Sequence, residues 1–354
     1  MKFDLRNIGL TAAREILGAT LIFSSIVKCV DPVGTAIFVE KYLATYSLEA
    51  LLPLATAIAI ALAVTEFALG MLLIDRVFYR AVSTITLALI FTFTIITLLS
   101  ATVLPIGECG CFGNAFELTP WQTFAKNVVL LTFAIVVWAS AKGDNQRRNY
   151  LSLSLAIVIP LAINLYALRH LPIIDFMPYD KGTNLRESVL EERRLASEGV
   201  QSWLKFRNLT TGEEVLFEAT NSDCWLDEEL EFVEAVAISS ELPEMVYSDF
   251  HLYNNAGEDV TQDVLSYSGR VALLCVNDSV ISKRQLCGIA TLKSEYSNDD
   301  ILILRAVPVE GEWTDGIEQL GVDAMTLRSI IRADVGVVVL NDGIVELKSN
   351  IIDL

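Results

Sequence analysis

The chain has 354 residues, of which 53% are hydrophobic, yet its formal net charge is −18 at pH 7. The two properties belong to different halves, because residues 1–169 hold 12 basic and 10 acidic residues whereas residues 170–354 hold 14 and 34. This combination excludes a single soluble globular domain, and the acidic half lacks the basic surface by which proteins bind nucleic acids.

Five apolar runs in the first half are each long enough to cross a bilayer, which takes about 20 residues. They cover residues 11–30, 51–74, 81–104, 121–141 and 150–169. Basic residues at the N-terminus and after the second and fourth runs predict that these regions are cytoplasmic. They are Lys2, Arg6, Arg76, Arg80, Lys142, Arg147 and Arg148. We therefore expect a multi-pass protein of a bacterial inner membrane, in contact with the lipid bilayer, whose acidic C-terminal domain is periplasmic.

Ionisable residues inside the apolar runs are costly unless they are paired or face a cavity. Arg14 lies in the first run and Glu66 in the second. An ion pair between them across two antiparallel helices is one expectation. Such a pair would either fix helix packing or handle protons or a quinone, and we take both residues as candidates for cofactor binding.

A short loop between the third and fourth runs carries the sequence Cys109-Gly110-Cys111. A disulfide at this spacing requires a tight turn, which glycine permits, and so small a ring is expected to be readily reduced. Cys29, at the end of the first run, is a third candidate catalytic cysteine. A fixed bridge from Cys29 to either loop cysteine remains an alternative. A structural zinc ion would require four ligands, so we predict no metal site.

Three stretches in this half carry a family resemblance. "REILGATLIFSSIVKCVDP" (14–32), "EFALG" (66–70) and "ECGCFG" (108–113) resemble the DoxX-like superfamily, and within it the MauE-like redox-associated membrane proteins. The resemblance covers residues 5–140 and implies a four-helix membrane domain over 1–145, with a fifth transmembrane helix added over 146–170. The family name implies methylamine utilisation, through maturation of a disulfide-rich dehydrogenase, and relatives are linked to sulfur-compound oxidation.

The acidic half predicts a linker over 171–200 and an α/β domain over 201–354. "SWLKFRNLTTGEEVLFEAT" predicts a hairpin. "RVALLCVND", "ILILRAVPV", "VGVVVLND" and "GIVELKSN" predict strands, with helices before the second and third. This order resembles a degenerate thioredoxin-like domain. Cys275 lies within a strand and Cys287 far along the next helix, and Val335 stands where thioredoxins carry a cis-proline, so the resemblance implies no oxidoreductase activity for this domain. Cys224 is either free or paired with Cys287.

The sequence thus predicts a membrane-bound thiol–disulfide or electron relay. Cys109 and Cys111 would exchange with a periplasmic partner protein, Cys29 would resolve the intermediate, and the bundle would pass electrons to or from a membrane carrier such as a quinone. The competing hypothesis is a non-catalytic membrane anchor or assembly subunit, whose acidic domain docks another envelope protein. With only two histidines in the chain, a serine–histidine hydrolase is not expected.

Overall fold

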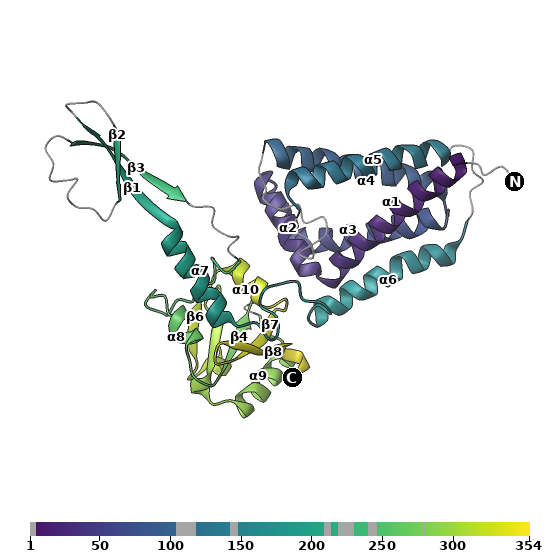
Figure 1. The fold of residues 1–354 in the computed structure, drawn as a ribbon. Helices are drawn as coiled ribbons and strands as arrows, with labels where there is room; N and C mark the ends of the chain where they lie inside the picture. The colour runs from purple at the N-terminus through teal and green to yellow at the C-terminus, as the bar shows by residue number, and fades with distance from the viewer. Residues whose placement is uncertain are drawn as a thin grey trace.

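The computed structural model describes residues 5–103, 118–141, 148–208, 214–218, 230–239, 246–278 and 280–354. It consists of an N-terminal helical bundle, a C-terminal domain built on a five-stranded mixed sheet, and an arm that ends in a three-stranded sheet (Figure 1).

Five helices of the bundle are long and apolar enough to cross a membrane. They are α1 (Leu5–Val30), α3 (Ala55–Ile74), α4 (Tyr79–Thr102), α5 (Pro120–Ser140) and α6 (Tyr150–Arg169). Each coincides within a few residues with one of the five apolar runs. The prediction of a multi-pass membrane protein is confirmed.

The segment between the first two spans forms two further helices, which the sequence analysis did not predict. They are α2 (Pro32–Thr45) and the 3-10 helix η1 (Glu49–Leu54). Asp31 starts α2, because its carboxylate accepts a hydrogen bond of 2.7 Å from the Gly34 amide and Pro32 occupies the first turn. With 14 residues α2 is only about 21 Å long, too short to cross a bilayer, and it lies at the end of the bundle nearest the five-stranded sheet (Figure 1).

Helices α1 and α3 run antiparallel and approach closely where two glycines meet. A Cβ atom added to Gly70 would lie 2.6 Å from the Gly18 carbonyl oxygen, and one added to Gly18 would lie 2.9 Å from the Gly70 carbonyl oxygen. Small residues allow such close packing of membrane helices. In the view of Figure 1, α4 and α5 form a separate layer above α1 and α3.

The C-terminal domain has the strand order β6-β5-β4-β7-β8. The pairs β4–β5 and β5–β6 are parallel, whereas β4–β7 and β7–β8 are antiparallel. The strands are β4 (Arg270–Val276), β5 (Ile301–Arg305), β6 (Glu318–Gly321), β7 (Val335–Asn341) and β8 (Ile344–Asn350). The helices are α8 (Thr261–Leu265), α9 (Lys283–Glu295) and α10 (Ala324–Ile330), with 3-10 turns η4 (Asn298–Asp300), η5 (Glu312–Thr314) and η6 (Ile351–Asp353).

The central strand β4 is covered on both faces. Val271, Leu273 and Cys275 belong to one apolar cluster, and the alternate residues of the strand belong to a second cluster that includes Ile289 of α9. A strand buried on both faces is expected to be continuously apolar, which is why the pattern of "RVALLCV" predicted it. The other three strands predicted for this sheet and both helices are present as well.

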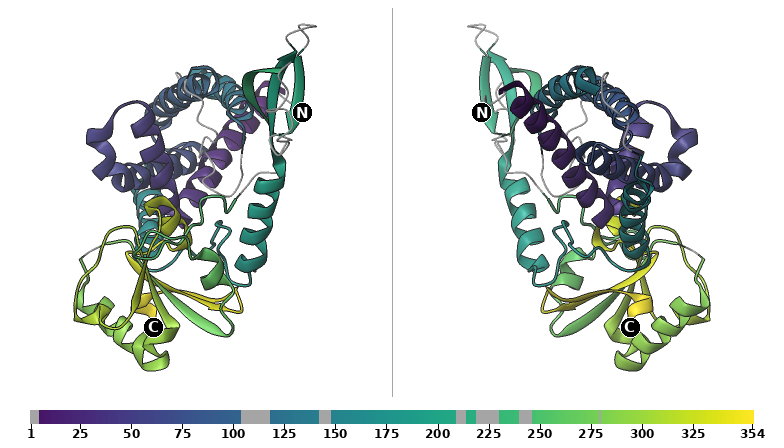
Figure 2. Two further views of the ribbon diagram at one scale, coloured as in Figure 1. Left: turned by 90° about the vertical axis from the view of Figure 1, so that its left-hand side faces the viewer. Right: turned by 90° about the vertical axis from the view of Figure 1, so that its right-hand side faces the viewer.

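The residues expected to form a linker are largely part of the fold. They contain α7 (Leu185–Gly199), whose Leu185 and Val189 are buried in the core of the C-terminal domain. Helix α7 continues into β1 (Val200–Asn208), which pairs antiparallel with β2 (Glu214–Glu218) and β3 (Leu230–Ser239). This three-stranded sheet stands clear of the five-stranded sheet in all the views of Figures 1 and 2.

The C-terminal domain is attached to one end of the bundle by side chains from both parts. Arg332 Nε lies 3.2 Å from Asp31 Oδ2, and both side chains are buried. Arg328 of α10 lies 2.7 Å from the Glu40 carboxylate of α2. At the end of α6, His170 pairs with Asp353 at 2.8 Å. These contacts fix the domain beside the end of α1 that carries Cys29.

Candidate functional site: a buried polar cluster in the bundle

A charged cluster lies between α1 and α3. Lys28 Nζ donates hydrogen bonds to Glu66 Oε2 at 2.8 Å and to Ser24 Oγ at 2.6 Å, and Ser24 donates to the same carboxylate oxygen at 2.9 Å. The side chains of Lys28 and Glu66 are only 4% and 2% exposed. Ser24 and Lys28 are four residues apart and therefore share one face of α1. The cluster is a buried ion pair whose two charges balance.

The prediction of an ion pair between Arg14 and Glu66 is wrong. Arg14 instead forms a 2.6 Å ion pair with its neighbour Glu15. The contact of Gly18 with Gly70 and Ile74 sets the antiparallel register, which places Arg14 beyond the C-terminal end of α3 and about three turns from Glu66. Lys28, which sequence analysis passed over, is the partner of Glu66.

Cys29 follows Lys28 and is 1% exposed. Asn164 Nδ2 of α6 donates to its sulfur at 3.1 Å, and Ser25 Oγ lies 3.6 Å away. The Ser25 hydroxyl has one hydrogen, which it donates to the Ala63 carbonyl at 2.6 Å. The thiol of Cys29 is therefore the donor toward Ser25 and the acceptor from Asn164. This free thiol has polar neighbours on two sides, contributed by α1 and α6.

The other two candidate cysteines, Cys109 and Cys111, lie outside the described residues, as does Cys224. The redox role of the two loop cysteines therefore stays a prediction, whereas the alternative of a fixed bridge from Cys29 is not formed in the structure, where Cys29 is a free thiol. The three described cysteines, Cys29, Cys275 and Cys287, carry free thiols.

A cavity of about 440 Å³ opens beside the charged cluster. Lys28, Ser24 and Glu66 lie on its α1 and α3 wall, and Thr97 and Asn127 lie on its α4 and α5 wall. Its remaining lining is mostly apolar and includes the rings of Phe38, Tyr42, Tyr46 and Phe93. The volume is within the range of small-molecule pockets, and a mostly apolar lining with a few polar groups is typical of them.

The cysteines of the C-terminal domain differ from Cys29. Cys275 is fully buried in the core, where its sulfur lies 3.7 Å from the Leu273 carbonyl oxygen, and burial raises the pKa of its thiol to about 12. Such a thiol is inert. Cys287 is exposed on α9. Cys275 is thus a small residue of the apolar core. Within the described ranges, no three His, Cys, Asp or Glu side chains are grouped to hold a metal ion.

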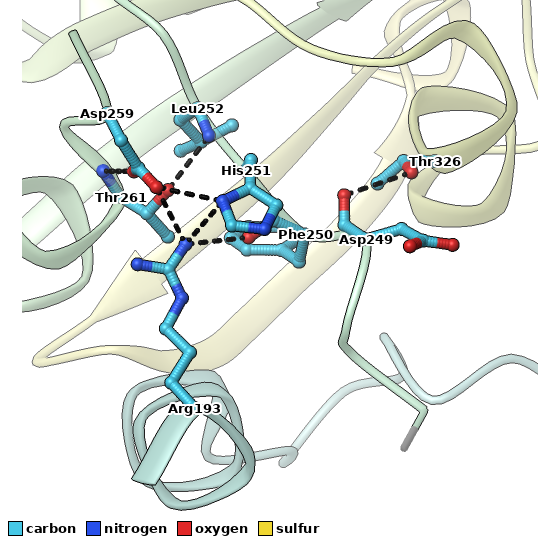
Figure 3. A network of polar contacts seen from close by, with 8 residues as sticks. All are labelled: Arg193, Asp249, Phe250, His251, Leu252, Asp259, Thr261 and Thr326. Carbon is cyan, nitrogen blue, oxygen red and sulfur yellow. Dashed lines mark hydrogen bonds and ion pairs between the residues drawn. The ribbon is translucent and has the colours of Figure 1, made fainter. Parts of the chain in front are cut away.

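His251 joins parts of the C-terminal domain to one another. Figure 3 shows Arg193 of α7 beside His251 and Asp259, with the Arg193 guanidinium 2.9 Å from His251 Nδ1 and 3.1 Å from the Asp259 carboxylate. Burial raises the pKa of Asp259, but hydrogen bonds from Thr261 and His251 and the charge of Arg193 outweigh it and hold this pKa well below its usual range. The network anchors α7, and with it the arm, to the domain.

Two comparisons with known proteins found similarity to part of the chain. "Protein TlpB" of Flavobacterium psychrophilum is 30% identical over 104 residues, which cover 27% of this chain and 28% of that protein. The match thus spans little more than a quarter of the curated relative. No solved structure matches the chain. Residues 6–140, which include Lys28, Cys29 and Glu66, match the family model of the methylamine utilisation protein MauE.

Proposed function

We propose that the protein is a membrane-bound thiol–disulfide relay in which Cys29 is a reacting thiol. The observation that carries the proposal is the position of Cys29, buried at the end of a membrane-spanning helix with polar contacts to Ser25 and Asn164. A structural cysteine has apolar neighbours, as Cys275 does, and needs no hydrogen-bond partners from another helix. The similarity of residues 6–140 to MauE supports the proposal.

In the proposed exchange, the Cys29 thiolate attacks one sulfur of a disulfide and displaces the other sulfur as a thiolate, which then takes up a proton. The Asn164 amide donates a hydrogen bond that stabilises the negative sulfur. Cys109 and Cys111 are the proposed disulfide partners, since a strained ring of this size exchanges readily. They would in turn exchange with a partner protein of the envelope.

The proposal also covers the helical bundle, its orientation in the membrane and the C-terminal domain. We assign the bundle to a DoxX-like four-helix core plus α6, with the N-terminus in the cytoplasm of a bacterium and the C-terminal domain in the periplasm. The C-terminal sheet has two parallel and two antiparallel pairs about its central strands, as a degenerate thioredoxin-like domain would. We propose that it binds the partner without reacting, because Cys275 is buried in the core and Cys287 has no second cysteine at the Cys-x-x-Cys spacing.

The experiment is differential alkylation in intact cells, before and after mild reduction, with each cysteine read by mass spectrometry. We expect Cys29, Cys109 and Cys111 to change state with the growth conditions and Cys287 to remain in one state. Cys111→Ser should abolish a mixed disulfide with the partner and leave membrane insertion intact, and Cys287→Ser is the matched control. The relay would be contradicted if Cys29, Cys109 and Cys111 each stayed in one redox state under all conditions.

A second candidate function is a non-catalytic anchor that holds another envelope protein. The observation that favours it is the three-stranded sheet, which projects from the C-terminal domain (Figure 1). The side chains of Val215, Phe232 and Val233 in this sheet are exposed. An anchor would retain its partner after all six cysteines are replaced, whereas a relay would lose the covalent intermediate. Co-purification with the cysteine-free chain separates the two functions.

A further inference from the structure

The wall of the cavity includes the buried ion pair of Lys28 and Glu66, which helix packing alone does not require. Removing two charges from water costs several kcal/mol per ion unless their geometry is good and their other hydrogen bonds are satisfied. Lys28 and Glu66 meet that condition through Ser24, but a pair of apolar residues would pack the same helices without the cost. An ionisable pair at this depth is by default a sign of a functional site.

The walls of the cavity define what it can hold. The charges of Lys28 and Glu66 cancel, and Lys126 of α5 is a further cation of the lining. An anionic ligand would have to compete with Glu66 for the Lys28 ammonium group. A neutral ligand with a hydrogen-bond acceptor avoids that competition. A second polar position lies on the α4 and α5 wall, where Asn127 Nδ2 donates to Thr97 Oγ1 at 3.3 Å. The ligand therefore has two polar ends and an apolar middle.

Aromatic side chains line the space between these two polar walls. Tyr42 and Tyr46 have nearly parallel rings whose centroids are 6.4 Å apart, and Phe38 and Phe93 complete the lining. Aromatic rings favour offset-stacked or edge-on contact with another flat ring. The cavity is lined by the membrane spans α1, α3, α4 and α5 and by the short helix α2, so a lipid-soluble ligand suits its surroundings.

We infer that this cavity binds the ring of a lipid-soluble quinone, with one carbonyl toward Lys28 and the other toward Asn127. The choice of a quinone among flat neutral ligands rests on the thiol relay proposed above; Cys29 is next to Lys28 in α1, although its sulfur contacts Asn164 of α6 and is not part of the cavity wall. The reaction balances as two thiols and one quinone giving one disulfide and one quinol. Two electrons pass from the sulfurs to the quinone, and the two thiol protons end on the quinone oxygens. At the oxygen that faces Lys28, the Lys28–Glu66 pair would pass on the proton.

The test uses the full chain in nanodiscs and short-tailed probes, decylubiquinone and menadione. We expect saturable binding of one quinone per chain. Phe93→Trp adds bulk inside the cavity and should weaken binding at least tenfold, whereas Phe91→Trp makes the same change at an exposed position of α4 and should leave the Kd unchanged. If thermal unfolding shows that Phe93→Trp is misfolded, Val39→Phe fills the cavity from α2 instead.

A second pair of variants tests the polar wall. The double change K28Q/E66Q removes both charges together, leaves no lone buried ion, and should weaken binding about tenfold. The matched control is R14Q/E15Q, which removes the other ion pair of α1 and should bind as the unaltered protein does.

The outcomes separate this inference from the relay, because the redox state of Cys29 is measured on the same samples. Non-saturable partitioning of the quinone, equal affinity of the two tryptophan variants, or a tightly bound phospholipid that the probes do not displace would overturn the inference, even if Cys29 cycles. Saturable binding that Phe93→Trp weakens would support it, even if Cys29 never changes state.

Discussion

At the scale of single residues, the bundle is organised around one buried charge and its partner. Glu66 could be identified from sequence, because a carboxylate inside an apolar run of this length is rarely tolerated without a role. Its partner could not, because pairing depends on which residues of two helices are level. That register is set by the contact of Gly18 with Gly70.

The pairing predicts a specific pattern of stability. Lys28→Met leaves the Glu66 carboxylate buried without its cation and should lower the free energy of unfolding by about 3 to 5 kcal/mol. The double change K28M/E66L replaces both charges with apolar side chains of similar size and should recover most of that loss. Thermal unfolding of the purified chain in detergent measures both. A single variant as stable as the double variant would mean that Glu66 is neutral or finds another partner.

At the scale of elements, the contact between α1 and α3 positions the whole polar cluster. Gly70→Ala would place a methyl group 2.6 Å from the Gly18 carbonyl, so the two backbones must separate. We expect a loss of about 1 to 3 kcal/mol in stability, together with weaker protection of Cys29 from membrane-permeant alkylating reagents. Gly9→Ala is the matched control on α1, because nothing lies within 4 Å of the added atom. Equal behaviour of the two variants would show that the helices adjust without cost.

The elements that sequence predicted share a simple signal, and those it missed lack it. The sequence predicted the five spans because their apolar runs are long. It also predicted β4, β5, β7 and β8, because strands covered on both faces have continuous apolar runs, but it did not predict the four-residue β6. Helix α2 was not predicted, because its residues lie between two spans, in a region that was interpreted as a loop. Strand β3 was not predicted, because apolar and polar residues alternate only weakly along it. It is stabilised by its pairing with β1, which its own sequence does not indicate.

At the scale of the whole molecule, one acidic residue connects the two halves. Asp31 caps α2 with one carboxylate oxygen and accepts from Arg332 with the other, two residues after Cys29. The segment between α10 and β7 therefore sits over the end of α1. Contacts of this kind join residues about 300 positions apart, which is why the sequence indicated two parts of the chain but no arrangement between them. The proposed partner-binding domain is thus held next to the proposed reacting thiol.

The contact of Arg328 with Glu40 offers a way to test this arrangement, because neither residue caps a helix or lines the cavity. An ion pair of this exposure contributes up to about 1 kcal/mol, but Arg328→Glu goes further by placing two carboxylates opposite each other. We expect faster hydrogen exchange in α10 and α2 for this variant, and restored protection in the charge-reversed pair R328E/E40R. Arg270→Glu is the control, since its partner Glu346 lies in the same sheet and its loss should leave α2 unchanged. If R328E exchanges like the unaltered chain, the domain is held by Asp31 and Arg332 and by the end of α6 without help from α10. If the reversed pair fails to restore protection, the two side chains do not meet in the membrane-embedded protein.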